Sequence, residues 1–407
     1  MREYLKLSMN NLITALSNAL DLYKSELLIS SHHKRVTIIA LKIAEYFRLS
    51  DGQRNDLFFS AILHDLGIST HKEKISMYQF EFKIPEPHCI RGYELINSTR
   101  ILKPYSKFIL YHHDRWDGKN KSGLKGNKIP LESQIIHLSD RIEILINYDS
   151  YVLEQKNSIR KKIKNYSEKL FNPELVDSFI KISEQDSFWF DLASPYLDDI
   201  LSQLSSESKI IIGLKDLKEI ALTFAKIVDD KSEFTKRHSE KIGKTARIIA
   251  SKLGSSQLEC ELIEIAGLLH DLGKLSIPDE ILDKPSGLTE QEFNIMKKHS
   301  YYTYHILGKI EGFEQMKEWA AFHHEKLNGA GYPFKKDKTN LSLFSKIMAV
   351  SDIFNALTEE RPYRKALDKN DVFKIMDEKV KKEEIDGNIV NVLKNNYEEI
   401  ISKIKRS

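Results

Sequence analysis

The chain has 407 residues, and at about 150 residues per domain this length predicts two or three domains. Its residues are 41% hydrophobic and 30% charged, a composition that is typical of globular proteins and excludes bulk disorder. The formal net charge is only +3, from 62 basic and 59 acidic side chains, so the overall charge gives no reason to expect DNA binding.

The first helical signal lies near the start of the chain. Apolar residues follow helical spacing at Leu5, Leu12, Ala15, Leu16 and Leu20, and the intervening Ser and Asn residues leave no signal-peptide core. No apolar run along the chain approaches the ~18 residues that a membrane span needs. Only two cysteines occur, too few for a disulfide framework. We therefore expect a cytoplasmic protein without membrane insertion.

Apolar stripes at helical spacing recur in both halves of the chain and predict helices that each turn one face to a core. The clearest stripes are Val36, Ile39, Ala40 and Ile43; Ile248, Ile249 and Leu253; and Leu258, Leu262, Ile265, Ala266 and Leu269. Ser256 and Glu259 form a candidate capping box before the last stripe, and Gly273 suits the C-terminus of that helix. No series of alternating strands is evident, so the sequence predicts an all-α protein.

Residues 151–215 differ in composition from the segments on either side. They are rich in Lys at first and then in Ser and Asp, and Asn172-Pro173 is typical of a helix that begins after a turn. This pattern indicates connecting helices. We therefore predict three parts: an N-terminal domain over 1–150, a helical linker over 151–215 and a C-terminal domain over 216–407.

The chain also contains an internal repeat of a His, a His-Asp pair, a His, a His-His pair and an Asp. In the first copy these residues are His32, His64, Asp65, His88, His112, His113 and Asp140. In the second copy they are His238, His270, Asp271, His299, His323, His324 and Asp352. The offset between the copies is 206 residues at first and then 211 and 212, as short insertions would give. Five matching elements in one order indicate a tandem duplication.

The repeated residue types are metal ligands. Neutral imidazoles and carboxylates are preferred by divalent iron, manganese or zinc. Five imidazoles and two carboxylates exceed what one tetrahedral ion can use, so each set fits two ions that share a carboxylate. Two ions about 3.5–4 Å apart suit phosphoryl transfer, because they activate water and stabilise the oxygens of an in-line displacement. Taken singly, a His-Asp pair is more often a surface or capping pair, so the prediction depends on the complete ordered set.

The second copy, from about Ile220 to Lys379, resembles an HD-GYP domain. The matching stretches are LLHDLGKLSIPDEILDKPSGLT (268–289), HHEKLNGAGYP (323–333), SDIFNALT (351–358) and RPYR (361–364). The resemblance implies two HD-type helical bundles, with metal ions at the centre of the second. It also implies hydrolysis of a bacterial cyclic dinucleotide to a linear dinucleotide, and it leaves open whether hydrolysis continues to mononucleotides.

The resemblance assigns roles to individual residues. All seven residues of the second copy would bind two divalent ions, iron or manganese, with Asp271 between the two ions. Asp271 and Lys274 would be catalytic, with Lys274 facing the substrate phosphate; the alternative for Lys274 is a solvated charge at a helix end. Some family members carry a glutamate four residues before the first histidine, associated with a third metal. Here that position is Phe234, with Glu233 one residue away, so we expect two ions.

Two further segments are candidates for substrate binding. Gly331, Tyr332 and Pro333 would form a loop in which glycine lets the backbone approach a phosphate and tyrosine offers a stacking face. A turn with a packed tyrosine is an equal alternative for Tyr332. Arg361 and Arg364 would hold the second phosphate or a guanine edge, and a salt bridge at a helix start is the alternative.

The first copy resembles the same family in a weaker form. It keeps every ligand position, so a second metal site is expected there, but Ile68 stands at the lysine position and the loop after Asp117-Gly118 has no GYP. We therefore favour a regulatory or structural domain over a second active site as the interpretation of the first copy. The tandem arrangement is similar to that of HD-GYP proteins that act on 3′3′-cGAMP.

Three functions fit these patterns. The first is a phosphodiesterase of cyclic dinucleotides, with the choice between c-di-GMP and 3′3′-cGAMP open. The second is a receptor or scaffold that binds the nucleotide or a partner such as a diguanylate cyclase, with hydrolysis slow or absent. The third is an HD-type nucleotidase or phosphatase that acts on mononucleotides, which the GYP loop and the RPYR segment disfavour. A homodimer is compatible with each.

Overall fold

The computed structural model describes residues 7–22, 31–70, 73, 77, 79–81, 86–205, 210–232, 237–360 and 365–405. Its contacts divide the chain into an N-terminal unit, Ser8–Ile211, and a C-terminal unit that runs from Ile212 onward. The strands in the described ranges are β1 (Leu7–Ser8) and β2 (Ile211–Ile212), which pair with each other. All other regular structure there is helical, which confirms the all-α prediction. None of the described helices is both long enough and apolar enough to cross a membrane.

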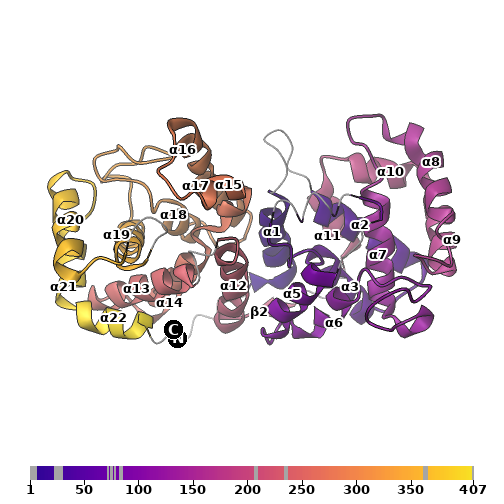
Figure 1. Ribbon diagram of the computed structural model, residues 1–407, viewed down its shortest axis with the longest axis horizontal. Helices are drawn as coiled ribbons and strands as arrows, with labels where there is room; N and C mark the ends of the chain where they lie inside the picture. Colours follow the sequence, from indigo (N-terminus) through magenta and orange to yellow (C-terminus); the bar gives the residue numbers. More distant parts are fainter. Residues whose placement is uncertain are drawn as a thin grey trace. The chain divides into compact units, whose positions relative to one another are not determined.

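The N-terminal unit is built around helix α2 (His32–Tyr46), whose faces contact several other helices (Figure 1). The other helical elements are α1 (Met9–Asp21), α3 (Asp51–Ile62), α5 (Glu86–Asn97), η1 (Lys103–Tyr105), α6 (Ser106–Leu110), η2 (Gly126–Lys128), α7 (Leu131–Glu143), α8 (Val152–Lys164), α9 (Pro173–Ile182), α10 (Asp186–Ala193) and α11 (Leu197–Leu204). The predicted stripe of α2 is fully buried against α3, α7 and α11. This packing brings the start of α2 to the middle of the unit.

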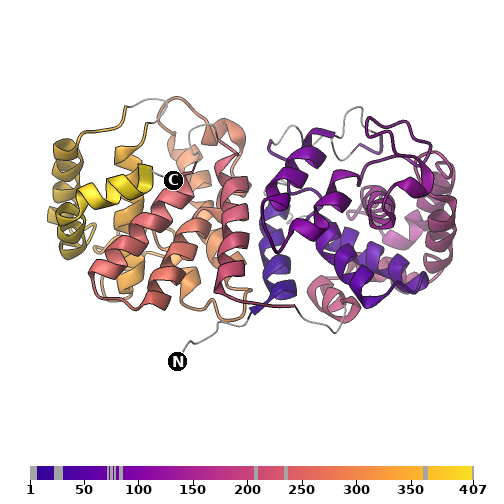
Figure 2. The same ribbon diagram turned by 90° about the horizontal axis from the view of Figure 1, so that it is seen from below.

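Helices α8–α11, which we expected to connect two domains, pack within the N-terminal unit. Figure 2 shows these helices, in magenta to pink, within the N-terminal unit, where α9 contacts α2 and α7 and α10 contacts α8 and α11. Phe179, Phe188 and Trp189 form a buried aromatic cluster, and Trp189 Nε1 donates a hydrogen bond to the Ser183 carbonyl at 2.9 Å. Burying these rings removes a large apolar area from water, which a solvated linker would leave exposed. The segment is therefore part of the first bundle.

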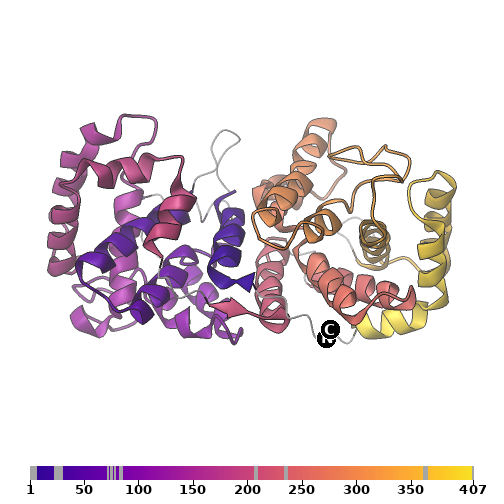
Figure 3. The same cartoon turned by 180° about the vertical axis from the view of Figure 1, so that it is seen from behind.

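The C-terminal unit repeats the arrangement with its own set of helices. They are α12 (Leu214–Asp229), α13 (His238–Lys252), α14 (Gln257–Leu269), η3 (Leu272–Ser276), α15 (Asp279–Leu282), α16 (Glu290–Met296), α17 (Lys298–Leu307), α18 (Met316–Ala321), α19 (Leu343–Thr358), α20 (Lys369–Lys381), α21 (Gly387–Asn395) and α22 (Tyr397–Lys405). Figure 3 shows α20–α22 gathered at one side of the unit, where they contact α13 and α19.

Glycines set how closely the central helices approach. A Cβ placed on Gly267 of α14 would lie 2.5 Å from the Gly243 Cα of α13, so the two backbones touch only because both residues lack a side chain. The predicted capping box is present, since the Glu259 amide donates to Ser256 Oγ at 3.3 Å and the Ser256 amide donates to Glu259 Oε2 at 2.8 Å. The helix ends at Leu269, before Gly273, which lies in η3 instead of acting as the expected C-cap.

Candidate metal centres

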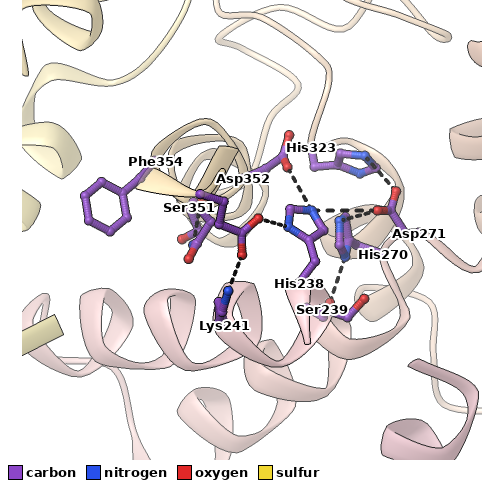
Figure 4. A network of polar contacts seen from close by, with 12 residues as sticks. His238, Ser239, Lys241, His270, Asp271, His323, Ser351, Asp352 and Phe354 are labelled. Carbon is purple, nitrogen blue, oxygen red and sulfur yellow. Dashed lines mark hydrogen bonds and ion pairs between the residues drawn. The ribbon is translucent and has the colours of Figure 1, made fainter. Parts of the chain in front are cut away.

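The seven repeated residues of the second copy converge at the centre of the C-terminal unit. Figure 4 shows His238, His270, Asp271, His323 and Asp352 pointing toward one another. They arrive from the start of α13, the end of α14, the turn after α18 and the middle of α19, and α17 adds His299. Residues far apart in the sequence thus meet because the helices that carry them pack around one point.

The donor atoms form two groups with a carboxylate between them. His238, His270 and Asp352 make one group, and His299, His323 and His324 make the other; within each group the donor atoms lie within 4.8 Å of one another. The carboxylate of Asp271 faces both groups. Its Oδ2 lies 3.1 Å from His270 Nε2, and its Oδ1 lies 3.6 Å from His299 Nε2. This is the arrangement that two ions sharing one carboxylate require.

Hydrogen bonds to the backbone orient the imidazoles. The Nδ1 atoms of His270, His299 and His323 donate to the carbonyls three residues earlier, at 2.8, 2.6 and 2.7 Å. Each bond holds the ring proton on Nδ1 and leaves Nε2 facing the centre as a lone-pair donor. The donor set and its orientation therefore fit two divalent cations.

The charge states of His299, His323 and Asp271 agree with metal binding. Against the effect of burial, the Asp271 carboxylate raises the pKa of His270. Burial lowers the pKa of His299 to about 3 and that of His323 to about 4, so both rings are neutral at pH 7. Burial opposes ionisation of Asp271, but His270 and Lys274 hold the pKa of that carboxyl well below its usual range. Neutral imidazoles and an ionised carboxylate are the forms that bind cations.

Sequence reasoning missed a glutamate that supports the first histidine. Glu359 Oε2 lies 2.9 Å from His238 Nδ1, and Lys241 Nζ donates to Glu359 Oε1 at 2.8 Å. Burial alone would raise the pKa of Glu359, but His238 and Lys241 lower it to about 2. The signal available in the sequence was a carboxylate seven residues after Asp352, at the C-cap of α19.

The predicted catalytic lysine lies at the edge of the centre. Lys274 Nζ is 2.5 Å from Asp271 Oδ2, and its side chain is 17% exposed. Asp352 and His324 are 13% and 28% exposed, whereas the other five members of the set are buried. The centre is therefore accessible from the side where Lys274, His324 and Asp352 lie.

The GYP loop borders the same side. The Tyr332 ring centroid lies 4.8 Å from that of His324, and burial of Tyr332 raises the pKa of its hydroxyl. Glu325 fixes the loop by accepting hydrogen bonds from the Phe334 amide at 2.6 Å and the Lys336 amide at 2.9 Å. Tyr332 is thus a packed tyrosine that also stands beside a metal-ligand candidate.

Of the other residues predicted to bind substrate, the structure describes Gly331 and Pro333. A Cβ on Gly331 would lie 2.4 Å from the Glu325 Cα, so glycine is required where the loop crosses its own backbone. Pro333 follows Tyr332 in a bend of the same loop. Arg361 and Arg364 lie outside the described residues, as do Glu233 and Phe234 at the position associated with a third metal.

The N-terminal unit builds a second centre from the first copy. His32, His64 and Asp140 form one donor group, and His88, His112 and His113 lie in the other together with Cys89. Asp65 stands between them, with its Oδ2 3.4 Å from His64 Nε2 and its Oδ1 3.4 Å from His88 Nε2. All seven predicted ligands of the first copy therefore come together.

The supporting contacts of the two centres are also alike. His64 and His112 donate from Nδ1 to the carbonyls three residues earlier, at 2.8 and 2.6 Å. Glu143 Oε2 lies 2.6 Å from His32 Nδ1, which matches the role of Glu359 although it comes from one turn after Asp140. Because the supporting glutamates stand at different distances from the repeated aspartates, alignment of the two copies could not reveal them.

Comparison with protein families identifies both halves of the chain. One HD domain model matches residues 223–389, and another HD domain model matches residues 29–145. These matches contain the two sets of converging residues.

Curated proteins resemble the chain over most of its length. The 3′3′-cGAMP-specific phosphodiesterase 1 of Vibrio cholerae is 31% identical over 381 residues, which cover 91% of this chain and 88% of that protein. The 3′3′-cGAMP-specific phosphodiesterase 3 of the same organism is 27% identical over 426 residues, which cover 91% of this chain and 90% of that protein. A cyclic di-GMP phosphodiesterase response regulator of Xanthomonas campestris is 36% identical over 169 residues, 40% of this chain and 45% of that protein.

One solved structure has the same architecture. The crystal structure of a cyclic GMP-AMP specific phosphodiesterase of Vibrio cholerae superposes with a TM-score of 0.68 at 26% sequence identity. The superposition covers 95% of this chain and 97% of that one. The tandem arrangement of two helical units is therefore shared over nearly the whole length of both proteins.

Proposed function

Because the chain belongs to the HD-GYP family of HD-domain phosphohydrolases, we propose that it is a metal-dependent phosphodiesterase that opens cyclic dinucleotides at the C-terminal centre. One observation carries this proposal: two groups of donors face a shared carboxylate, Asp271, on a side of the unit that solvent reaches. A receptor without turnover has no need of an accessible two-metal centre with a lysine at its edge.

The seven C-terminal residues would hold two divalent ions, iron or manganese, which supply Lewis acidity for water activation and for the phosphoryl oxygens. His238, His270 and Asp352 would bind one ion and His299, His323 and His324 the other, with Asp271 between them. Mixed imidazole and carboxylate ligands match the preferences of these metals.

The protein's own groups would prepare the phosphodiester for reaction. Lys274, at the open edge, would bind a phosphate oxygen and place its charge where negative charge develops. In the reaction the water oxygen bonds to phosphorus, the bond to the 3′ oxygen breaks, and that oxygen gains a proton. The product is a linear dinucleotide with a 5′ phosphate, and a second hydrolysis would yield mononucleotides.

Among the cyclic dinucleotides, 3′3′-cGAMP is the substrate that we propose. Support comes from the two relatives that match about nine tenths of this chain, since both are named as specific for 3′3′-cGAMP. The relative named for cyclic di-GMP matches 40% of this chain. Tyr332 and the loop around it would border a purine base. The cytoplasm as the compartment, a diguanylate cyclase as a partner and a homodimer stay predictions.

The test is hydrolysis by the full chain loaded with manganese or with ferrous iron under anaerobic conditions. We expect 3′3′-cGAMP to be converted to the linear dinucleotide, with a higher kcat/KM than c-di-GMP. Asp271→Ala should abolish turnover, whereas Asp371→Ala, which removes an exposed carboxylate on α20, should leave it unchanged. Wild-type rates in the Asp271→Ala protein would refute the assignment, and binding without turnover would favour the receptor.

A further inference from the structure

A sulfur atom joins the imidazoles in the second donor group of the N-terminal centre. Cys89 Sγ lies 3.6 Å from His88 Nε2 and 3.7 Å from His112 Nδ1, and His88 Nε2 lies 3.3 Å from His112 Nε2. With His113, these residues place four donor atoms within 4.8 Å of one another, and all four residues are buried. Sequence reasoning assigned three histidines to this group and did not include the cysteine.

The C-terminal centre holds a hydroxyl where the N-terminal centre holds the thiol. Cys89 and Ser300 each follow the matching histidine, and Ser300 Oγ lies 3.0 Å from His299 Nε2. A thiolate is a strong ligand for zinc and ferrous iron, whereas a neutral hydroxyl is not among their usual ligands. From this difference we infer that the N-terminal unit binds a thiophilic divalent cation through His88, Cys89, His112 and His113.

Arg141 makes the other donor group of the N-terminal centre, His32, His64 and Asp140, a less favourable cation site. Its Nε and Nη2 atoms donate to Asp140 Oδ2 at 3.1 and 2.5 Å, and its Nη1 donates to the Gln79 carbonyl at 2.7 Å. The guanidinium thus brings a fixed positive charge to a ligand of that group. In the C-terminal unit the matching residue is Ile353, which brings no charge.

The site formed by His88, Cys89, His112 and His113 is enclosed by protein, as is typical of sites that retain their ion. None of the seven repeated residues of the first copy, nor Cys89, is more than 8% exposed. Four protein donors fill a tetrahedral shell and leave no position for a substrate, as in structural zinc sites. Coordination requires the thiolate, so binding transfers the thiol proton to solvent. The absence of a lysine at Ile68 agrees with an ion that is held without turnover.

Cobalt provides a direct probe of this site, because Co²⁺ bound to a thiolate gives an intense charge-transfer absorption. The seven donors of the C-terminal centre include no sulfur, so cobalt there adds no such band. The chain has two cysteines, and Cys260→Ser leaves Cys89 as the single thiol. We expect the full-length Cys260→Ser protein to show the band after cobalt loading, and Cys89→Ser to lack it.

Metal content gives a second measurement. Zinc-loaded Cys89→Ser protein should hold about one ion per chain fewer than the Cys260→Ser control after dialysis. Hydrolysis of 3′3′-cGAMP should persist in both variants, which separates this inference from the proposed function of the other unit. The inference is overturned if cobalt-loaded Cys260→Ser protein shows no thiolate band, whether or not Cys89→Ser folds.

Discussion

Lys274 and Ile68 occupy the same position in the two copies, directly after the HDLG motif. Lys274 contacts Asp271 through its ammonium group and lies at the open side of its centre. A methyl-terminated side chain at this position can neither bind a phosphate oxygen nor neutralise charge in the transition state. The difference between the copies therefore concerns chemistry and leaves the donor sets unchanged.

Replacing this lysine should affect turnover and leave metal binding intact. We expect Lys274→Met to lower kcat by about 10²–10³-fold, as the loss of one charged donor to the transition state does elsewhere. Metal content should stay within error of the wild type. The matched control is Lys309→Met, at an exposed position after α17. A role limited to the helix end would instead lower the melting temperature and spare kcat.

A buried acid beside the C-terminal centre makes stability depend on pH. Burial raises the pKa of Asp229 from 3.8 to about 6, although the Ser239 amide and hydroxyl donate hydrogen bonds to its carboxylate. The folded protein therefore binds this proton more tightly than the unfolded chain. The resulting stabilisation is complete below pH 3.8 and is lost as the pH rises through about 6, a change of about 3 kcal/mol.

The amide variant isolates this effect, because Asp229→Asn keeps the shape of the side chain and carries no charge. We expect the free energy of unfolding of the variant, relative to that of the wild type, to be higher at about pH 7.5 than at about pH 4.5, two values on either side of the raised pKa. Urea unfolding at each pH measures it. An equal free-energy difference between the two proteins at both pH values would contradict the expectation.

At the scale of elements, a close backbone approach joins η3 to α17. A Cβ on Gly273 would lie 2.0 Å from the His299 carbonyl oxygen. The Gly273 amide also donates a hydrogen bond to Thr303 Oγ1 at 3.0 Å, which holds the backbone in this position. The same approach exists at Gly67 in the first copy, where a Cβ would lie 2.1 Å from the His88 carbonyl oxygen. The glycine of each HDLG motif therefore sets where the third histidine of its centre stands.

Adding a methyl group at this contact should displace α17. We expect Gly273→Ala to cost about 3 kcal/mol or more in unfolding free energy and to lower the affinity for the second ion. Gly287→Ala is the matched control, because a Cβ there meets nothing within 4 Å. Thermal unfolding and metal titration measure the two effects, and equal behaviour of both variants would contradict the steric argument.

The sequence predicted the donor sets because the spacing of reactive residue types is visible in the chain itself. It did not predict Glu359, Glu143, Arg141 or Cys89, since their roles depend on which face of a helix meets the centre. The location of α8–α11 was also missed, because composition does not show that Trp189 is fully buried. Gly273 was expected at a helix end, whereas its use is a contact with a residue 26 positions later.

On the scale of the whole molecule, the two units carry similar donor sets with different access and charge. The C-terminal set has two partly exposed members and a lysine, whereas the N-terminal set is buried and faces Arg141. We therefore expect His88→Ala and Asp271→Ala each to reduce the metal content of the full chain, and only Asp271→Ala to abolish hydrolysis. Elemental analysis beside a turnover assay tests both parts. Equal loss of turnover in the two variants would show that both centres are catalytic.

A hydrogen bond from Nδ1 to the carbonyl three residues earlier ties five imidazoles to the backbone that carries them: His64, His112, His270, His299 and His323. The rings are consequently set in place by the bundle before any cation arrives. At the C-terminal centre, where His324 and Asp352 are partly exposed, we expect metal ions to exchange while the protein stays folded, so the ion bound there follows from the metals supplied.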